Sequence, residues 1–177
     1  MSDLLKNIIR FILFILVQVL VLNKIPSLHR FITPYLYFLF ILWLPFKTPR
    51  LSMTLIGFLF GLSLDFFVQT PGLHAAACTM IAYLRSFLIM LLMPKETLEI
   101  SYAEPSITSM GFMPYATYVL VLTFVHHSYV VFLEWLQFPN ILHFLGKVFA
   151  TTGISLLLIT ITEMLFNRKS RYRTNVA

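Results

Sequence analysis

Hydrophobic residues occur in six long runs along the chain, separated by short stretches that contain charged residues, proline or glycine. The runs cover residues 7–22, 31–46, 51–68, 74–93, 113–136 and 141–166. A helix that crosses the hydrocarbon core of a bilayer needs about 17–25 mostly apolar residues, and each run approaches or reaches this length. The pattern predicts an all-α membrane protein, a bundle of six transmembrane helices that forms a single integral membrane domain over residues 1–177.

The second run departs most from this pattern. Its apolar centre, from Tyr35 to Phe46, is short, and Pro34 and Pro45 bracket it. Proline lacks an N–H and breaks the interior of a helix, and a short hydrophobic stretch is often accommodated by tilting or by distortion of the bilayer. A tilted, broken or interfacial segment is therefore an alternative to a full helical crossing here.

The composition supports a membrane environment for most of the chain. Only 11% of the residues are charged and 59% are hydrophobic, whereas about 25% of a soluble domain is charged. With a mean hydropathy of +0.85, a chain of this length has more apolar surface than one aqueous core buries. The single cysteine, Cys78, lies in an apolar run and has no partner for an internal disulfide, so we interpret it as a small packing residue.

Positive charge is distributed unevenly between the connections and gives the chain a net charge of +6. The basic residues flank the apolar runs, which is the pattern that orients membrane proteins rather than the clustered face of a nucleic-acid-binding domain. With a cytoplasmic N-terminus, that side carries Lys6, Arg10, Lys47, Arg50, Lys95, Arg168, Lys169, Arg171 and Arg173, and the other side carries only Lys24 and Arg30. Both termini are therefore predicted to be cytoplasmic, which requires an even number of crossings. The first run lacks a small-residue cleavage site and is expected to be a retained span.

The longest connection, residues 94–112, falls on the predicted cytoplasmic side and is partly acidic. It carries Glu96, Glu99 and Glu104 beside Lys95. Acidic residues are repelled by the anionic lipid surface. We expect either a solvated loop or a contact with a cytoplasmic partner.

Four charged residues lie inside the apolar runs, where a charge is costly unless it is paired or faces a protein interior. At ~1.5 Å per residue, Asp65 lies about 5 Å and Lys147 about 9 Å below the outer ends of their spans. Arg85 lies about 12 Å and Glu163 about 5 Å above the inner ends by the same arithmetic. These depths predict that the last span neutralises both neighbours, through an Asp65–Lys147 pair and an Arg85–Glu163 pair. The alternative for Lys147 and Glu163 is extension to the headgroups.

Small residues recur at helical spacing in three of the runs, and such stripes allow helix backbones to approach closely in membranes. In the third run, Gly57, Gly61 and Asp65 share one face because they are four residues apart. The corresponding stripes are Cys78, Ala82 and Ser86 in the fourth run and Gly146, Ala150 and Gly153 in the last. We expect a compact packing of these three spans.

The sequence contains no pattern that indicates catalysis, a cofactor or a metal site. It has no G-x-S-x-G elbow, no HExxH, no glycine-rich phosphate loop and no acidic metal motif. His126 and His127 lie in the middle of the fifth run, but adjacent helical residues point about 100° apart and do not easily chelate one ion together. Interhelical hydrogen bonding is the expected role of this pair, with proton transfer and metal binding as alternatives. The protein is not expected to be an enzyme.

The segment GLSLDFFVQTPGLHAA, residues 61–76, resembles the signature of the MreD family of bacterial rod shape-determining membrane proteins. That family typically has an aspartate in a glycine-containing span, a short Pro-Gly turn and an alanine-rich start to the next span. Asp65, Pro71, Gly72 and Ala75 occupy these places. Tyr83-Leu-Arg85 and the pattern Tyr118…His126-His127…Phe132-Leu-Glu134 also agree with one lineage of the family, so the resemblance covers nearly the whole chain.

The resemblance implies a non-enzymatic subunit of the elongation machinery that builds lateral cell-wall peptidoglycan, located in the bacterial inner membrane. The implied partners are MreC, reached within the membrane and near its outer face, the cytoplasmic actin-like MreB filament, and the RodA glycosyltransferase with its penicillin-binding transpeptidase. The resemblance also implies a fold similar to the six-helix substrate-binding subunits of energy-coupling-factor vitamin transporters.

That similarity makes a small-molecule transport subunit the main alternative, because such a fold encloses a ligand cavity near the outer face. Residues 7–22 contain no alanine or glycine, which disfavours the small-residue docking stripe that these subunits use. A flippase or channel would require the four charged residues of the spans to remain unpaired. We expect Gly61, Asp65, Pro71, Gly72 and His74 to carry the function, through helix packing and the presentation of a surface to partners.

Overall fold

The structure is a computed structural model of the whole chain, and it describes residues 3–25, 33–93, 104–134 and 140–166. All regular elements in these residues are helical. Helix α1 (Asp3–Leu16) continues into a π-helical turn (Val17–Val21) and a 3-10 turn (Leu22–Lys24). The remaining elements are α2 (Leu39–Leu42), α3 (Arg50–Val68), α4 (Leu73–Leu92), α6 (Ile107–Met110), α7 (Phe112–Glu134) and α8 (Ile141–Leu165).

Within the described residues, five helices are long and apolar enough to cross a membrane, which is one fewer than predicted. They span Leu4–Lys24, Arg50–Val68, Leu73–Leu92, Phe112–Glu134 and Ile141–Leu165. The second predicted span, 31–46, is the exception, because its described part, 33–46, contains no helix other than the four-residue α2. Pro34 and Pro45 bracket this helix, and residues 33–36 before it have no regular secondary structure. Residues 31–32 of that span and 135–136 of the fifth lie outside the described residues.

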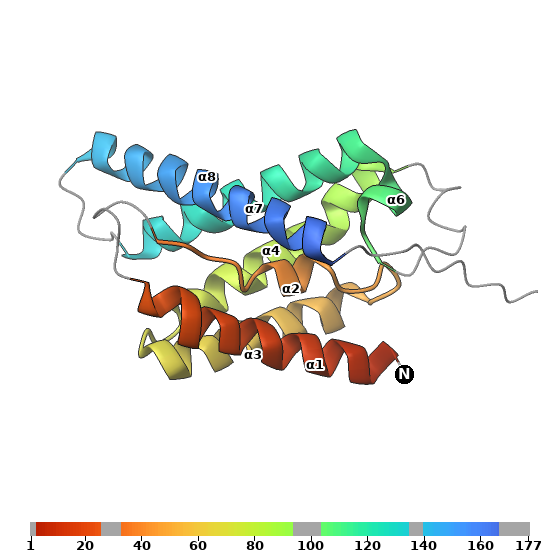
Figure 1. Cartoon of the computed structure of the whole chain (residues 1–177), viewed down its shortest axis with the longest axis horizontal. Coiled ribbons are helices and arrows are strands. Elements are labelled where there is room, and N and C mark those ends of the chain that lie inside the picture. Colours follow the sequence, from red (N-terminus) through yellow and green to blue (C-terminus); the bar gives the residue numbers. More distant parts are fainter. Residues whose placement is uncertain (1–2, 26–32, 94–103, 135–139, 167–177) are drawn as a thin grey trace, which may run out of the picture.

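Residues 33–49, which we call the crossing segment, run through the middle of the bundle from one end to the other (Figure 1). Helices α1 and α3 lie on one side of it and α7 and α8 on the other, with α4 between them. Because the chain traverses the bundle five times as a long helix and once as this segment, the start of α1 and the end of α8 lie at the same end (Figure 1). We call this the Glu104 end and the opposite one the Asp65 end. Which end faces the cytoplasm stays a prediction, and residues 1–2 and 167–177 lie outside the described residues.

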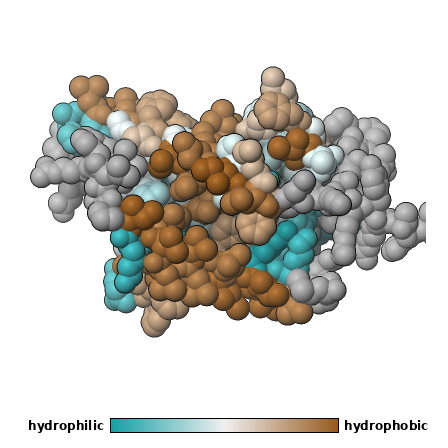
Figure 2. Space-filling model, in the orientation of Figure 1, coloured by the Kyte–Doolittle hydropathy of each residue, from teal (hydrophilic) through white to brown (hydrophobic). Residues whose placement is uncertain are grey.

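The crossing segment forms the core. Tyr37, Phe38, Leu39, Ile41 and Leu42 are completely buried. Aromatic rings of the segment contact rings of the surrounding helices, as where Phe40 lies 4.6 Å from Phe60 and 5.5 Å from Phe11 between ring centroids. The outer faces of the helices expose large apolar side chains instead, and these cover much of the surface in Figure 2. This arrangement, apolar outside as well as inside, suits a lipid environment.

Helices α3 and α4 form a tight antiparallel hairpin, as the small residues predicted. A Cβ added to Gly57 would lie 2.7 Å from the Ala82 Cβ and 2.9 Å from the Cys78 carbonyl oxygen. The stripe in α8 behaves differently, because a Cβ at Gly146 or Gly153 would meet no atom within 4 Å. Helix α8 packs against α7, so the expected close packing of the third, fourth and last spans is correct for the first two only.

Candidate functional site

The candidate site is built around the turn that joins α3 to α4 at the Asp65 end. Helix α3 ends at Val68, and Gln69 adopts a left-handed conformation with φ 61°. Gly72 has φ 83°, which glycine adopts without strain, and Pro71 restricts its own φ to the value that a tight turn requires. The Leu73 N–H donates to the Thr70 carbonyl at 3.2 Å. The predicted tight reversal at Pro71-Gly72 is therefore present.

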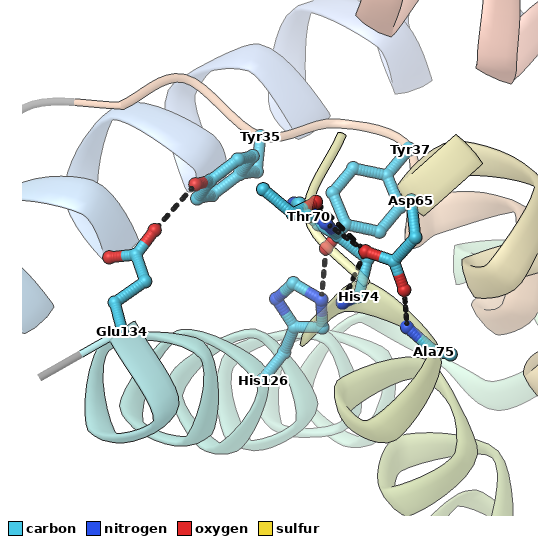
Figure 3. A network of polar contacts seen from close by, with 8 residues as sticks. All are labelled: Tyr35, Tyr37, Asp65, Thr70, His74, Ala75, His126 and Glu134. Carbon is cyan, nitrogen blue, oxygen red and sulfur yellow. Dashed lines mark hydrogen bonds and ion pairs between the residues drawn. The ribbon is translucent and has the colours of Figure 1, made fainter. Parts of the chain in front are cut away.

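The Asp65 carboxylate is the anchor of this turn and is only 3% exposed. Its Oδ1 accepts hydrogen bonds from the His74 N–H at 2.9 Å, the His74 Nδ1 at 2.8 Å and the Thr70 hydroxyl at 2.9 Å. Its Oδ2 accepts from the Ala75 N–H at 2.9 Å (Figure 3). The carboxylate thus caps the first turn of α4, where free N–H groups and the helix dipole favour a negative charge.

His74 is held in a fixed orientation by this carboxylate. Its Nδ1 lies within hydrogen-bond distance of both Asp65 and the Thr70 hydroxyl, at 2.8 and 3.0 Å. When Nδ1 donates its hydrogen to the carboxylate, Nε2 of a neutral ring is left as an acceptor. The ring also contacts Tyr35 and Tyr37, with centroids 5.9 and 5.4 Å away. Asp65, Pro71, Gly72 and His74, which the sequence singled out, therefore form one unit.

A cavity of about 380 Å³ lies beside this unit. Its polar lining includes Gln18, Asn23, Tyr35, Thr70, His74 and Glu134. The Tyr35 hydroxyl points toward Glu134, donating at 3.4 Å (Figure 3). A volume in the range of about 300–1,000 Å³ with a few converging polar groups is typical of sites for small molecules.

Gln18 also lines the cavity, and the sequence did not single it out. It lies in the π-helical turn of α1 and is 1% exposed. Its Oε1 accepts from the N–H groups of Leu36 and Tyr37, and its Nε2 donates to the Pro34 carbonyl at 3.1 Å and to Asn23. Non-helical backbone at membrane depth is tolerated only where protein groups satisfy it, and Gln18 supplies those groups. Gln18 is the single polar residue of the stretch 11–22, and this is the signal that could have identified it.

Arg85 performs the same task at the other end of the crossing segment. It is 1% exposed, and it donates to the Leu44 carbonyl and, at 2.9 Å, to the Tyr118 hydroxyl. The Tyr118 hydroxyl in turn donates to the Leu42 carbonyl at 2.9 Å. The predicted Arg85–Glu163 ion pair is therefore wrong. Arg85 instead bonds to a backbone carbonyl of the crossing segment, which is not paired within a helix.

Glu163 and Lys147 also have other partners than predicted. The Glu163 carboxylate accepts from the Trp43 indole at 2.7 Å and from the Tyr115 hydroxyl, and Lys147 forms an ion pair with Glu134 at 2.5 Å. The predicted Asp65–Lys147 pair is wrong as well. A similar depth does not by itself make two residues an ion pair. Lys147 is not near Asp65 because α8 packs on α7 rather than on α3. The start of α4 provides the hydrogen-bond donors for Asp65 instead.

His126 and His127 are completely buried, but the predicted interhelical hydrogen bonding is not observed in the described residues: His126 contacts the crossing segment, and His127 contacts its neighbour in the same helix. The Tyr37 hydroxyl and the His126 Nε2 are 2.8 Å apart, and the two Nδ1 atoms of the histidines are 3.3 Å apart. Within the described residues, no group of three or more His, Cys, Asp or Glu side chains is arranged to hold a metal ion.

Five membrane-length helices packed around a buried crossing segment are the architecture of a multi-pass membrane protein. Comparison with known proteins found no matching family model, no matching curated protein and no matching solved structure.

Proposed function

We propose that this protein is a non-enzymatic membrane subunit of the cell-wall elongation machinery of rod-shaped bacteria. In this role it maintains cell shape by assembling peptidoglycan-synthesis partners, namely MreC, MreB, and RodA with its penicillin-binding transpeptidase, at the inner membrane. The proposal rests on the likeness of residues 61–76 to the MreD family. One observation supports it: the residues that carry this likeness converge on the single turn that Asp65 anchors.

The geometry of this turn suits the presentation of a surface to a partner. Asp65 and His74 are buried, whereas Gln69, Pro71 and Gly72 are exposed at the tip of the hairpin. Phe66, one residue after the anchoring aspartate, is 75% exposed and faces away from the bundle. A rigid tip with an exposed aromatic side chain loses little conformational entropy when a partner helix binds. We therefore assign recognition to the tip and rigidity to the buried network.

Depletion of the protein in its native host, scored by cell shape, tests the proposal. Rounding that the wild-type gene reverses is expected. Phe66→Ala removes exposed apolar surface but leaves the hydrogen bonds of Asp65 in place. The variant should therefore fail to restore rods while the protein remains as abundant as wild type. Ser63→Ala, on the same helix, is the matched control and should restore rods. Unchanged shape on depletion would contradict the proposal.

The cavity at the Asp65 end favours a second candidate function, a small-molecule-binding subunit of a membrane transporter. Its lining combines hydrogen-bonding groups from Tyr35, His74 and Glu134, as recognition of a polar vitamin-like molecule requires. Thermal unfolding of the purified protein in the presence of such molecules distinguishes the candidates. A saturable rise in Tm that Tyr35→Phe reduces would support transport, and normal cell shape on depletion would accompany it.

A further inference from the structure

Hydroxyl groups on the helices follow a common pattern, from which two threonines depart. Most serine and threonine hydroxyls inside an α-helix donate to the carbonyl four residues earlier. Five described side chains do so at 2.6–2.8 Å, namely Thr54, Ser63, Thr79, Thr160 and Thr162. The hydroxyls of Thr123 in α7 and Thr152 in α8 are buried, yet within the described residues neither has a hydrogen-bond partner. These two hydroxyls therefore do not form the usual bond to their own helix.

The Nε2 atom of His127 is a third buried group without a partner among the described residues. Its other nitrogen, Nδ1, faces the Nδ1 of His126, whose Nε2 faces the Tyr37 hydroxyl. When two neutral imidazoles share a hydrogen bond, one of the two facing nitrogen atoms donates and the other accepts. If Tyr37 donates, the hydrogen of His127 is on Nε2 and needs an acceptor; if Tyr37 accepts, Nε2 is bare and needs a donor. In both cases the chain of hydrogen bonds requires a further partner at this atom.

The three groups lie at one level between α7 and α8. Thr123 and His127 are four residues apart and share a face of α7. Helices α7 and α8 are antiparallel, and the Tyr115–Glu163 and Glu134–Lys147 contacts between them place Thr152 opposite residues 126–129 of α7. Tyr35 joins the two sides, because its ring stacks on His127 at 5.7 Å and its N–H donates to Ser155, one turn beyond Thr152.

We propose that Thr123, His127 and Thr152 form an internal water-binding site between α7, α8 and the crossing segment. Water suits this site because a water molecule both donates and accepts hydrogen bonds. It can therefore bond to the His127 Nε2 whichever way the hydrogen bonds of the Tyr37–His126–His127 chain run. Buried waters typically make about three hydrogen bonds to polar groups that otherwise have none. The partner has to be this small, since Thr123 and His127 are completely buried and Thr152 is 5% exposed.

Replacement of each threonine by valine tests the site through the sign of its effect on stability. If water bridges the groups, Thr123→Val and Thr152→Val each remove one of its bonds, and the Tm of the purified protein falls by a few degrees. The double variant should lose less than the sum, because both bonds serve the same water. Thr160→Val, whose hydroxyl bonds its own helix, is the matched control and should change Tm little. A dry site would instead give a higher Tm for both variants, since each removes an unpaired buried polar atom, and this would overturn the proposal.

Solid-state NMR in bilayers gives a second readout that does not depend on stability. Magnetisation transferred from water protons should reach the His127 side chain, and the signal should weaken in Thr152→Val. His74, which lines the cavity at the Asp65 end, is the internal positive control for water contact. Transfer to His74 but not to His127 would refute the water site.

Discussion

Asp65 and His74, nine residues apart, are joined at two points: one carboxylate oxygen accepts the backbone N–H of His74 at 2.9 Å and its ring Nδ1 at 2.8 Å. The same carboxylate therefore projects from the last turn of α3, caps the first turn of α4 and orients a side chain toward the neighbouring cavity. Because the hairpin supplies all of these donors, a buried charge near the end of a span needs no cation from another helix.

Asp65→Asn should destabilise the protein by about 2–3 kcal/mol, because an amide nitrogen cannot accept the N–H groups that a carboxylate oxygen does. The loss should appear as a lower free energy of unfolding in detergent, with the amides of His74 and Ala75 exchanging faster with deuterium. Ser63→Ala, on the same helix, removes only a bond to the Leu59 carbonyl and should cost less than ~0.5 kcal/mol. Equal stability of Asp65→Asn and wild type would contradict the capping role.

Gly61→Ala should destabilise the hairpin by about 2–4 kcal/mol, as overpacking against a rigid backbone does. The new Cβ would lie 2.5 Å from both the Ala75 Cα and the His74 carbonyl oxygen, so α3 and α4 would have to separate. The control is Gly153→Ala in α8, where no atom lies within 4 Å and helix propensity favours alanine by up to ~1 kcal/mol. The two substitutions should change Tm in opposite directions, and a matching fall in both would refute this account.

Gln18→Leu should leave two N–H groups and one carbonyl of the crossing segment unpaired, at a cost of about 2–4 kcal/mol. Hydrogen–deuterium exchange is the direct measurement, since the amides of Leu36 and Tyr37 bond to the Gln18 oxygen. Gln18→Glu keeps that acceptor and loses the bond to the Pro34 carbonyl, so exchange at the two amides should stay slower than in Gln18→Leu. Identical exchange in both variants would exclude this role of Gln18.

Glu104 should make stability depend on pH at the opposite end of the bundle. Burial by itself raises the pKa of the Glu104 carboxyl, but the bonds and charges of Lys6 and Arg10 outweigh it and hold that pKa below its ordinary value of 4.5. A lowered pKa in the folded state means that the contribution is complete above pH 4.5 and is lost as the pH falls through the folded value. The two ion pairs, at 2.8 and 2.9 Å, should contribute on the order of 1 kcal/mol.

Glu104→Gln tests this dependence. At pH 7 the variant should unfold more easily than wild type, and this difference should shrink below pH 4.5, as the pH falls through the folded-state pKa of the wild-type carboxyl. A constant difference between the two proteins from pH 7 to below pH 4.5 would refute the assignment.

The ion pairs also show that Glu104 contacts α1 rather than lying in a solvated loop. Residues 94–103 of that connection lie outside the described residues.

The hydrophobic pattern by itself determined the membrane-length helices, because lipid requires long apolar stretches whose backbone bonds are satisfied internally. It also determined the close approach of α3 and α4, since glycine at four-residue spacing leaves a helix face without side chains. The tight turn at Pro71-Gly72 followed from local backbone chemistry in the same way. Each of these features depends on residues near one another in the sequence.

Only the tertiary structure decided what the buried polar residues contact. Prolines around residues 34–45 prevent a sixth helix, and the unpaired backbone that results recruits Gln18, Arg85, Tyr118 and Ser155 from four different helices. No pattern within one span encodes these contacts, because they depend on how the helices are rotated and which of them are neighbours. Arithmetic of depth therefore assigned the charged residues the wrong partners, because it uses only their positions along their own helices.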